Sequence, residues 1–175
     1  MLTRRLFTGS LFALAACTVS GGTSRAASKG PREPAIKGLP AESKTIEPVH
    51  LSDAEWKKRL DPQAYYVLRE QGTDRAFTGD LWDNHDKGDY LCAGCGLLLF
   101  HSADKFASGT GWPSFTRPAA KNRVKVAEDD SFGMTRNEVR CARCGGHQGH
   151  VFPDGPPPTG KRWCIDSSSL IFRPA

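Results

Sequence analysis

The chain has 175 residues, of which 38% are hydrophobic, and it contains 18 glycines and 12 prolines. That length fits one domain of ordinary size with a tail, and the glycine and proline content favours a loop-rich fold over a helical bundle. Three of the 24 basic residues lie in residues 1–27, which leaves 21 basic against 19 acidic residues in the rest of the chain. A charge this balanced argues against binding to nucleic acid.

The N-terminal segment has the pattern of an export signal. Its first residues, MLTRRLFTGSLFALAACTVS, place Arg4 and Arg5 before an uncharged, apolar run over residues 6–16. A helix of that length spans about 16 Å, which is too short for a bilayer core of about 30 Å. We therefore predict a cleavable signal of the twin-arginine type over residues 1–27, and a location in the bacterial periplasm or cell envelope.

Two cleavage sites remain open from the sequence. The string LAAC, which ends at Cys17, resembles a lipobox, and cleavage there would make Cys17 a lipid anchor and the only membrane attachment. Cleavage at the small residues Ala26 and Ala27 would instead release a soluble protein. Residues 28–50 follow with four prolines and predict a semi-rigid linker.

Two short helices are expected where the body begins, at residue 51. In LSDAEW, Ser52 and Glu55 form a capping box, which predicts a helix to about Leu60. In DPQAYYVLRE, Asp61 is a helix cap and Pro62 takes the first helical position.

The remainder is typical of β-structure. DYLCAGCGLLLF and NEVRCARCGGHQGHVF place short apolar or alternating runs on both sides of a C-x-x-C turn, while RVKVAE and SFGMTRNEVR alternate with period two. KRWCI and SLIF supply further strands near the C-terminus. Between the strands, ASGTGWPSFTRP and PDGPPPTG are Gly- and Pro-rich loops of the kind that carries function. The predicted class is all-β with small peripheral helices.

Four cysteines form two matching pairs, Cys92 with Cys95 and Cys141 with Cys144, each followed by glycine. Two such turns brought together offer four sulfurs at tetrahedral positions, as one structural Zn²⁺ requires, and iron fits the same ligands. Two disulfides are an alternative in an exported protein, but a bridge across two residues stabilises little. A redox C-x-x-C would need a βαβ context, which this sequence lacks. The spacing therefore favours zinc.

Cys164, in KRWCID, has no such partner. If this stretch is a strand, Arg162, Cys164 and Asp166 share one face, and Trp163 and Ile165 share the other. The arginine would favour the thiolate, and the aspartate would disfavour it.

The residues alone also allow interpretations of this region in which none of them has a catalytic role. Cys164 fits a small buried hydrophobe, and Trp112 fits an ordinary core position. His147 and His150 are titratable neighbours, structural residues or alternative zinc ligands.

A family resemblance narrows the choice. The strings SGTGWPSF, VRCARCGGHQGHVFPDGPPPTGKRWCIDSSSL and YLCAGCGLLLF resemble the methionine-R-sulfoxide reductase (MsrB) family, in the order of that family and over residues 51–175. The resemblance implies a fold of two antiparallel sheets, a β-tent, with a zinc tetrathiolate remote from the active site. It also implies repair of oxidised methionine in proteins or peptides.

The same resemblance assigns roles to particular residues. Cys164 becomes the nucleophile that attacks the sulfur of methionine R-sulfoxide and turns into a sulfenic acid, which a thioredoxin-like or other thiol then reduces. His147 and His150 are the candidates for protonating the sulfoxide oxygen, and Arg162 for stabilising the developing charge. Trp112 and Phe115 would bind the substrate, with the indole packed against its methyl group.

Two positions depart from the family pattern. Asp166 stands where the family commonly has Asn, and its carboxylate could disfavour the thiolate. Thr110 stands where many members carry a resolving cysteine, so we expect an external thiol to reduce the sulfenic acid directly. Two alternatives remain: a zinc-ribbon module that recruits a partner, and a domain that Asp166 has made inactive and that only binds oxidised methionine.

Overall fold

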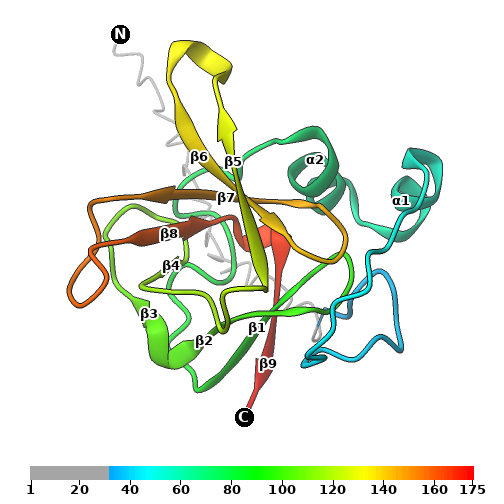
Figure 1. Cartoon of the computed structure of the whole chain (residues 1–175), viewed down its shortest axis with the longest axis horizontal. Helices are drawn as coiled ribbons and strands as arrows, with labels where there is room; N and C mark the ends of the chain where they lie inside the picture. Colours follow the sequence, from blue (N-terminus) through cyan, green and yellow to red (C-terminus); the bar gives the residue numbers. More distant parts are fainter. Residues whose placement is uncertain (1–31) are drawn as a thin grey trace, which may run out of the picture.

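The computed structural model describes residues 32–175, which fold into two antiparallel sheets with two short helices beside them (Figure 1). One sheet has three strands in the order β2-β1-β9, and the other has six in the order β3-β4-β8-β7-β6-β5. The elements are α1 (Asp53–Arg59), α2 (Pro62–Glu70), β1 (Gly88–Cys92), β2 (Leu98–His101), β3 (Lys105–Phe106), β4 (Ser114–Phe115), β5 (Val124–Asp129), β6 (Arg136–Cys141), β7 (His147–Phe152), β8 (Arg162–Ile165) and β9 (Leu170–Pro174). The predicted all-β class with small helices is confirmed.

The export signal and the lipobox predicted within residues 1–27 lie outside the described residues and stay predictions. Within residues 32–175, no helix is long and apolar enough to cross a membrane.

Both helices begin where their caps predict. The Ser52 hydroxyl accepts the Glu55 amide at 3.3 Å, and the Glu55 carboxylate accepts the Ser52 amide at 2.9 Å. The Asp61 carboxylate accepts the Ala64 amide at 2.9 Å at the start of α2. Each cap satisfies backbone donors that the helix leaves unpaired, and Trp56 then anchors α1 in the core.

The core lies between the two sheets and is rich in aromatic rings. Phe115 of β4 stacks on Phe100 of β2 with ring centroids 4.4 Å apart, and it meets Tyr90 of β1 edge-on at 4.9 Å. All three side chains are fully buried. Because Phe115 faces this interior, it does not line the cavity over Cys164 that is described below, and its position does not support the prediction that it binds substrate.

Residues 32–50, predicted as a linker, pack along the body as an ordered segment. The Ala35 amide donates to the Ala93 carbonyl at 2.8 Å, and the Ala41 carbonyl accepts the Leu98 amide at 3.0 Å. Apolar side chains of the segment contact the core: Ala35, Ile36, Leu39, Ile46 and Val49. The prolines therefore shape a strap over the domain, because its apolar side chains and backbone groups find partners there.

A smaller difference concerns the stretch SFGMTRNEVR, which alternates like a strand over its whole length. In the structure, Ser131–Gly133 is a 3-10 turn that joins β5 to β6, and the strand begins only at Arg136. Gly133 has φ +70°, a conformation that closes this turn and that favours glycine. The β5–β6 hairpin stands out from the body in Figure 1.

The position of Phe115 generates a prediction about stability. Phe115→Ala should lower the free energy of unfolding by about 3–5 kcal/mol, because it leaves a cavity among stacked rings. Val126→Ala, at a half-exposed position on β5, should change it by no more than about 0.5 kcal/mol. Urea unfolding of both variants measures the difference. An unaltered stability with a raised KM for Phe115→Ala would restore the substrate-binding assignment.

Candidate active site

Strand β8 lies between β4 and β7 and sets the direction of the side chains around Cys164. Cys164 is paired in register with Ser114 on one side and with His150 on the other. Trp163 and Ile165 are buried in the core, so Cys164 faces the opposite way, as the predicted alternation requires.

Glycine at position 149 is what lets β7 approach β8 at Cys164. Gly149 has φ +137°, and a Cβ there would lie 2.1 Å from the carbonyl oxygen of Cys164. Any side chain at this position would push the two strands apart.

A cavity of 260 Å³ opens over Cys164. Five of the residues singled out from the sequence line it: Trp112, His150, Arg162, Cys164 and Asp166. Four further residues complete much of its wall: Thr73, Thr110, Arg136 and Phe152. Two predicted residues, His147 and Phe115, do not line it.

Arg162 is held rigidly beside the thiol. Its guanidinium makes two hydrogen bonds of 2.9 Å to the carboxylate of Asp154 and lies 4.6 Å above the ring centroid of Phe152.

Burial raises the pKa of the Cys164 thiol, while Arg162 and a hydrogen bond from Thr110 act to lower it and Asp166 acts to raise it. The balance leaves the pKa above its ordinary value, so the free thiol predominates at neutral pH.

Asp166 is 3% exposed, and its carboxyl oxygen Oδ1 accepts the Asp74 amide at 2.7 Å. Burial raises the pKa of Asp166 to about 7, although that hydrogen bond acts in the other direction. The departure from the family pattern therefore places a titratable group in the wall of the cavity.

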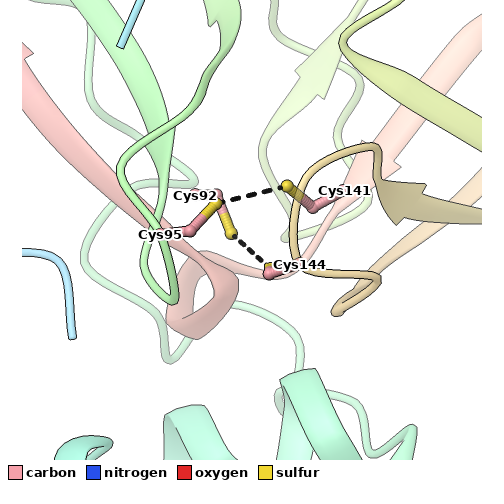
Figure 2. Close-up of side chains that lie close together, drawn as sticks. All are labelled: Cys92, Cys95, Cys141 and Cys144. Atoms are coloured by element: carbon pink, nitrogen blue, oxygen red, sulfur yellow. Dashed lines mark hydrogen bonds between the residues drawn. The ribbon is translucent and has the colours of Figure 1, made fainter. Parts of the chain in front are cut away.

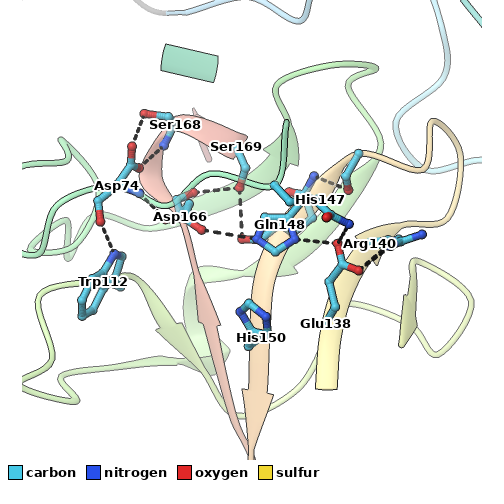
Figure 3. A network of polar contacts seen from close by, with 12 residues as sticks. Asp74, Trp112, Glu138, Arg140, His147, Gln148, His150, Asp166, Ser168 and Ser169 are labelled. Atoms are coloured by element: carbon cyan, nitrogen blue, oxygen red, sulfur yellow. Dashed lines mark hydrogen bonds and ion pairs between the residues drawn. The ribbon is translucent and has the colours of Figure 1, made fainter. Parts of the chain in front are cut away.

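Asp74 connects the loop after α2 to the site (Figure 3). Its carbonyl accepts the indole Nε1–H of Trp112 at 2.9 Å, which fixes the plane of that ring. Its carboxylate accepts the amide and the hydroxyl of Ser168, both at 2.7 Å, and an amide hydrogen of Gln63 at 2.9 Å. One residue thus positions Trp112, Asp166 and the turn that follows β8.

The two histidines occupy different places. His150 lines the cavity and its Nε2 lies 2.7 Å from a carboxylate oxygen of Asp129, which Arg136 also contacts at 2.8 Å. His147 is set back behind Asp166, 3% exposed, with Nδ1 2.7 Å from Glu138. Neither ring belongs to the cysteine cluster, which removes them as alternative metal ligands.

Glu138 fixes the orientation of His147. Burial raises the pKa of Glu138, but hydrogen bonds from Arg140 and His147 outweigh it and leave the pKa below the ordinary value. Burial also lowers the pKa of His147, against the effect of Glu138. At neutral pH the pair is therefore a carboxylate and a neutral imidazole.

The four paired cysteines gather where the two sheets meet (Figure 2). Cys92 and Cys95 lie on the β1–β2 turn, and Cys141 and Cys144 on the β6–β7 turn, with all four sulfurs within 4.8 Å of one another. Sulfur pairs across the sheets are 3.6 Å apart. Metal–sulfur bonds of about 2.3 Å in a tetrahedron imply sulfur separations of about 3.8 Å, so the cluster can hold a metal ion.

A single residue bridges the cysteine cluster and the cavity. The Gln148 amide nitrogen lies 3.6 Å from the sulfur of Cys92, and the Gln148 carbonyl accepts the Asp166 amide at 2.8 Å. The cysteine cluster, which was expected to be remote from the active site, is therefore connected to the wall of the cavity through strand β7.

Sequence reasoning missed Asp74, Glu138, Arg136 and Thr73. The string QGTDRAF around Asp74 has no periodicity or spacing that signals a role, and its function comes largely from backbone atoms that any residue carries. Glu138 carried a weak signal, as a charged residue in an otherwise alternating strand.

These features define a β-sheet protein in which a four-cysteine cluster that can hold a metal ion lies where two sheets meet, and in which a separate cysteine faces a cavity. A family model described as the SelR domain matches residues 60–174. "Peptide methionine sulfoxide reductase MsrB" of Thiobacillus denitrificans is 56% identical over 70% of this chain and 93% of its own length. The proteins of that name from Methanosarcina barkeri and Agrobacterium fabrum are 57% and 52% identical, over 71% and 74% of this chain and 88% and 96% of their own lengths.

The chain therefore belongs to the MsrB family of oxidoreductases.

Proposed function

We propose that this protein reduces methionine R-sulfoxide in peptides and proteins, and in the free amino acid, with Cys164 as the nucleophile and an external thiol as the reductant. Family membership supports the reaction class. The observation that carries the assignment is that Cys164 is the one thiol of residues 32–175 outside the metal cluster, and it faces a cavity.

The chemistry requires a single sulfur. The Cys164 thiolate attacks the electrophilic sulfur of the sulfoxide, the sulfur–oxygen bond of the substrate breaks, and oxygen ends on Cys164 as a sulfenic acid. Two electrons pass from the cysteine to the substrate sulfur, which leaves as a thioether. Two external thiols then restore Cys164 with the release of one water and one disulfide.

The cavity wall provides the recognition. Trp112 and Phe152 offer apolar faces to a methyl group, and Arg162 offers a fixed cation to the polarised oxygen. With 260 Å³, the cavity accommodates the end of one side chain, with the rest of the peptide outside it.

Cys164→Ser should abolish reduction of the R epimer in a methionine-sulfoxide peptide, because serine cannot form the sulfenic acid. The assay follows separated R and S epimers with dithiothreitol and residues 28–175. Wild type should consume only the R epimer, and Val126→Ala, at a position that does not line the cavity, should match it. Consumption of the S epimer, or activity in folded Cys164→Ser, would refute the assignment, and an inert, folded wild type would favour a binding role.

The absence of a resolving cysteine in residues 32–175 gives a second prediction. Sulfoxide without reductant should leave Cys164 as a trappable sulfenic acid, with no internal disulfide, as read by mass spectrometry. Thr110→Cys should instead form a disulfide between the introduced thiol and Cys164, because the Thr110 hydroxyl reaches the Cys164 sulfur. An internal disulfide in the wild type would contradict direct reduction by an external, thioredoxin-like thiol.

We further propose that the metal is one structural Zn²⁺, since four buried thiolates in this spacing suit zinc. Cys95→Ser should lose the metal and lower the unfolding temperature, whereas Cys164→Ser should retain one equivalent. Elemental analysis of both purified variants, with thermal unfolding before and after chelation, measures this. Full zinc content in Cys95→Ser would place the metal elsewhere.

A further inference from the structure

A buried carboxyl stands in the cavity wall without a charge to balance it. Asp166 makes one ion-pair contact within residues 32–175, a long one of 4.0 Å from its Oδ2 to Nε2 of His147. Its other oxygen, Oδ1, is occupied by the Asp74 amide. Oδ2 therefore has no close donor among the described residues (Figure 3).

The nitrogen that faces Oδ2 cannot supply a proton readily. Nδ1 of His147 lies 2.7 Å from a carboxylate oxygen of Glu138, which is acceptor-only, so the ring proton sits on Nδ1. Nε2 of the neutral ring then carries a lone pair, and it makes no hydrogen bond among the described residues. Two acceptors, Oδ2 of Asp166 and the buried Nε2 of His147, thus face each other across 4.0 Å, an arrangement that favours a proton on the carboxyl.

Cys164 needs a nearby group that accepts its proton. Its thiol is partly buried and predominantly protonated, so it requires a base before it can attack. Its position on β8, two residues before Asp166, places both groups on one wall of the same cavity. Burial sets the pKa of Asp166 at about 7, which suits a group that must both accept and donate a proton near neutral pH.

We propose that Asp166 takes the proton of the Cys164 thiol and delivers it to the sulfoxide oxygen. The inference rests on the reductase function proposed above. Atoms and charge balance within the pair: the thiol S–H bond breaks, the carboxylate becomes a carboxylic acid, and that acid protonates the oxygen that ends as the sulfenic hydroxyl. Asp166 returns to a carboxylate, and no other reactant is needed.

His147 and Glu138 are positioning residues in this scheme. Glu138 holds the imidazole in the tautomer that turns a lone pair toward Oδ2, so His147 has no proton to give to Asp166 and the carboxyl takes its proton from the cavity side. An asparagine amide at position 166 could accept the Asp74 amide in the same way, but it could not carry a proton between sulfur and oxygen.

The charged and titratable groups around Asp166 come from every element packed against it. These groups are Asp74 on the loop after α2, Arg136 and Glu138 on β6, His147 and His150 on β7, and Arg162 and Cys164 on β8.

The scheme predicts a particular pH profile. Below about pH 7 both Asp166 and Cys164 hold protons, above it the pair holds one, and above the pKa of Cys164 it holds none. The one-proton pair is the reactive form, so single-turnover formation of methionine should follow a bell-shaped curve whose acid limb lies near pH 7.

Asp166→Asn should remove that acid limb and leave one rise, at the pKa of Cys164. The rate at slightly alkaline pH should fall on the order of 100-fold, the usual effect of losing a proton-transfer group. Asp80→Asn removes an exposed carboxylate outside the cavity and should keep the bell shape and the rate. An acid limb that persists in Asp166→Asn, or a wild-type rate in that variant, would overturn the proposal while leaving the reductase function intact.

The pH dependence of stability tests the Asp166 proton assignment separately from the reductase function, because it needs no turnover. The folded state holds the Asp166 proton more tightly than the unfolded state, so this residue favours folding below about pH 4 and that contribution is lost as the pH rises through about 7. The stability of the wild type relative to Asp166→Asn should therefore fall across this window in urea unfolding. A constant difference would overturn the proton assignment, whereas a wild type inert at every pH would overturn the reductase function and this scheme with it.

Discussion

The meeting of four cysteine sulfurs is the constraint on which the rest of the structure depends. The two sheets share no strand, and the sulfurs of their turns lie within 4.8 Å of one another. A metal ion held there would add to the packing between the two sheets, because its binding free energy would become folding free energy. The strap of residues 32–50 adds to this, since the buried guanidinium of Arg143 donates to carbonyls of both Cys95 and Pro40.

A chain of hydrogen bonds connects that junction to the cavity through β7 and the end of β8. Gln148 contacts the sulfur of Cys92 and holds the backbone of Asp166, and Asp166 in turn holds the amide of Asp74. Asp74 then fixes the indole of Trp112. Each link is a buried or partly buried hydrogen bond, and removing one partner would leave a desolvated group that costs about 1–3 kcal/mol. The thiol and its aromatic neighbour are thereby placed by the same network that closes the fold.

Electrostatics at the site depends on how each charge is compensated. Arg162 is paired with Asp154 through two hydrogen bonds, and Arg136 is paired with Asp129, which also contacts the ring of His150, so both arginine charges are held in place. Asp166 differs because burial acts on it without a cation in bonding distance. A carboxylate beside Cys164 would disfavour the thiolate, but a pKa of about 7 suits the proton exchange that we propose for Asp166.

The sequence by itself determined the β class, the helix caps, the cysteine pairs and the face shared by Arg162, Cys164 and Asp166, because local patterns and strand alternation depend on neighbours along the chain. It did not determine that Phe115 points into the core, that residues 32–50 pack as a strap, or that His147 lies behind the cavity wall. It also gave no indication of the role of Asp74. Which group a residue meets across the fold, and how much water remains around it, depends on contacts between distant segments, and only the tertiary structure decides these.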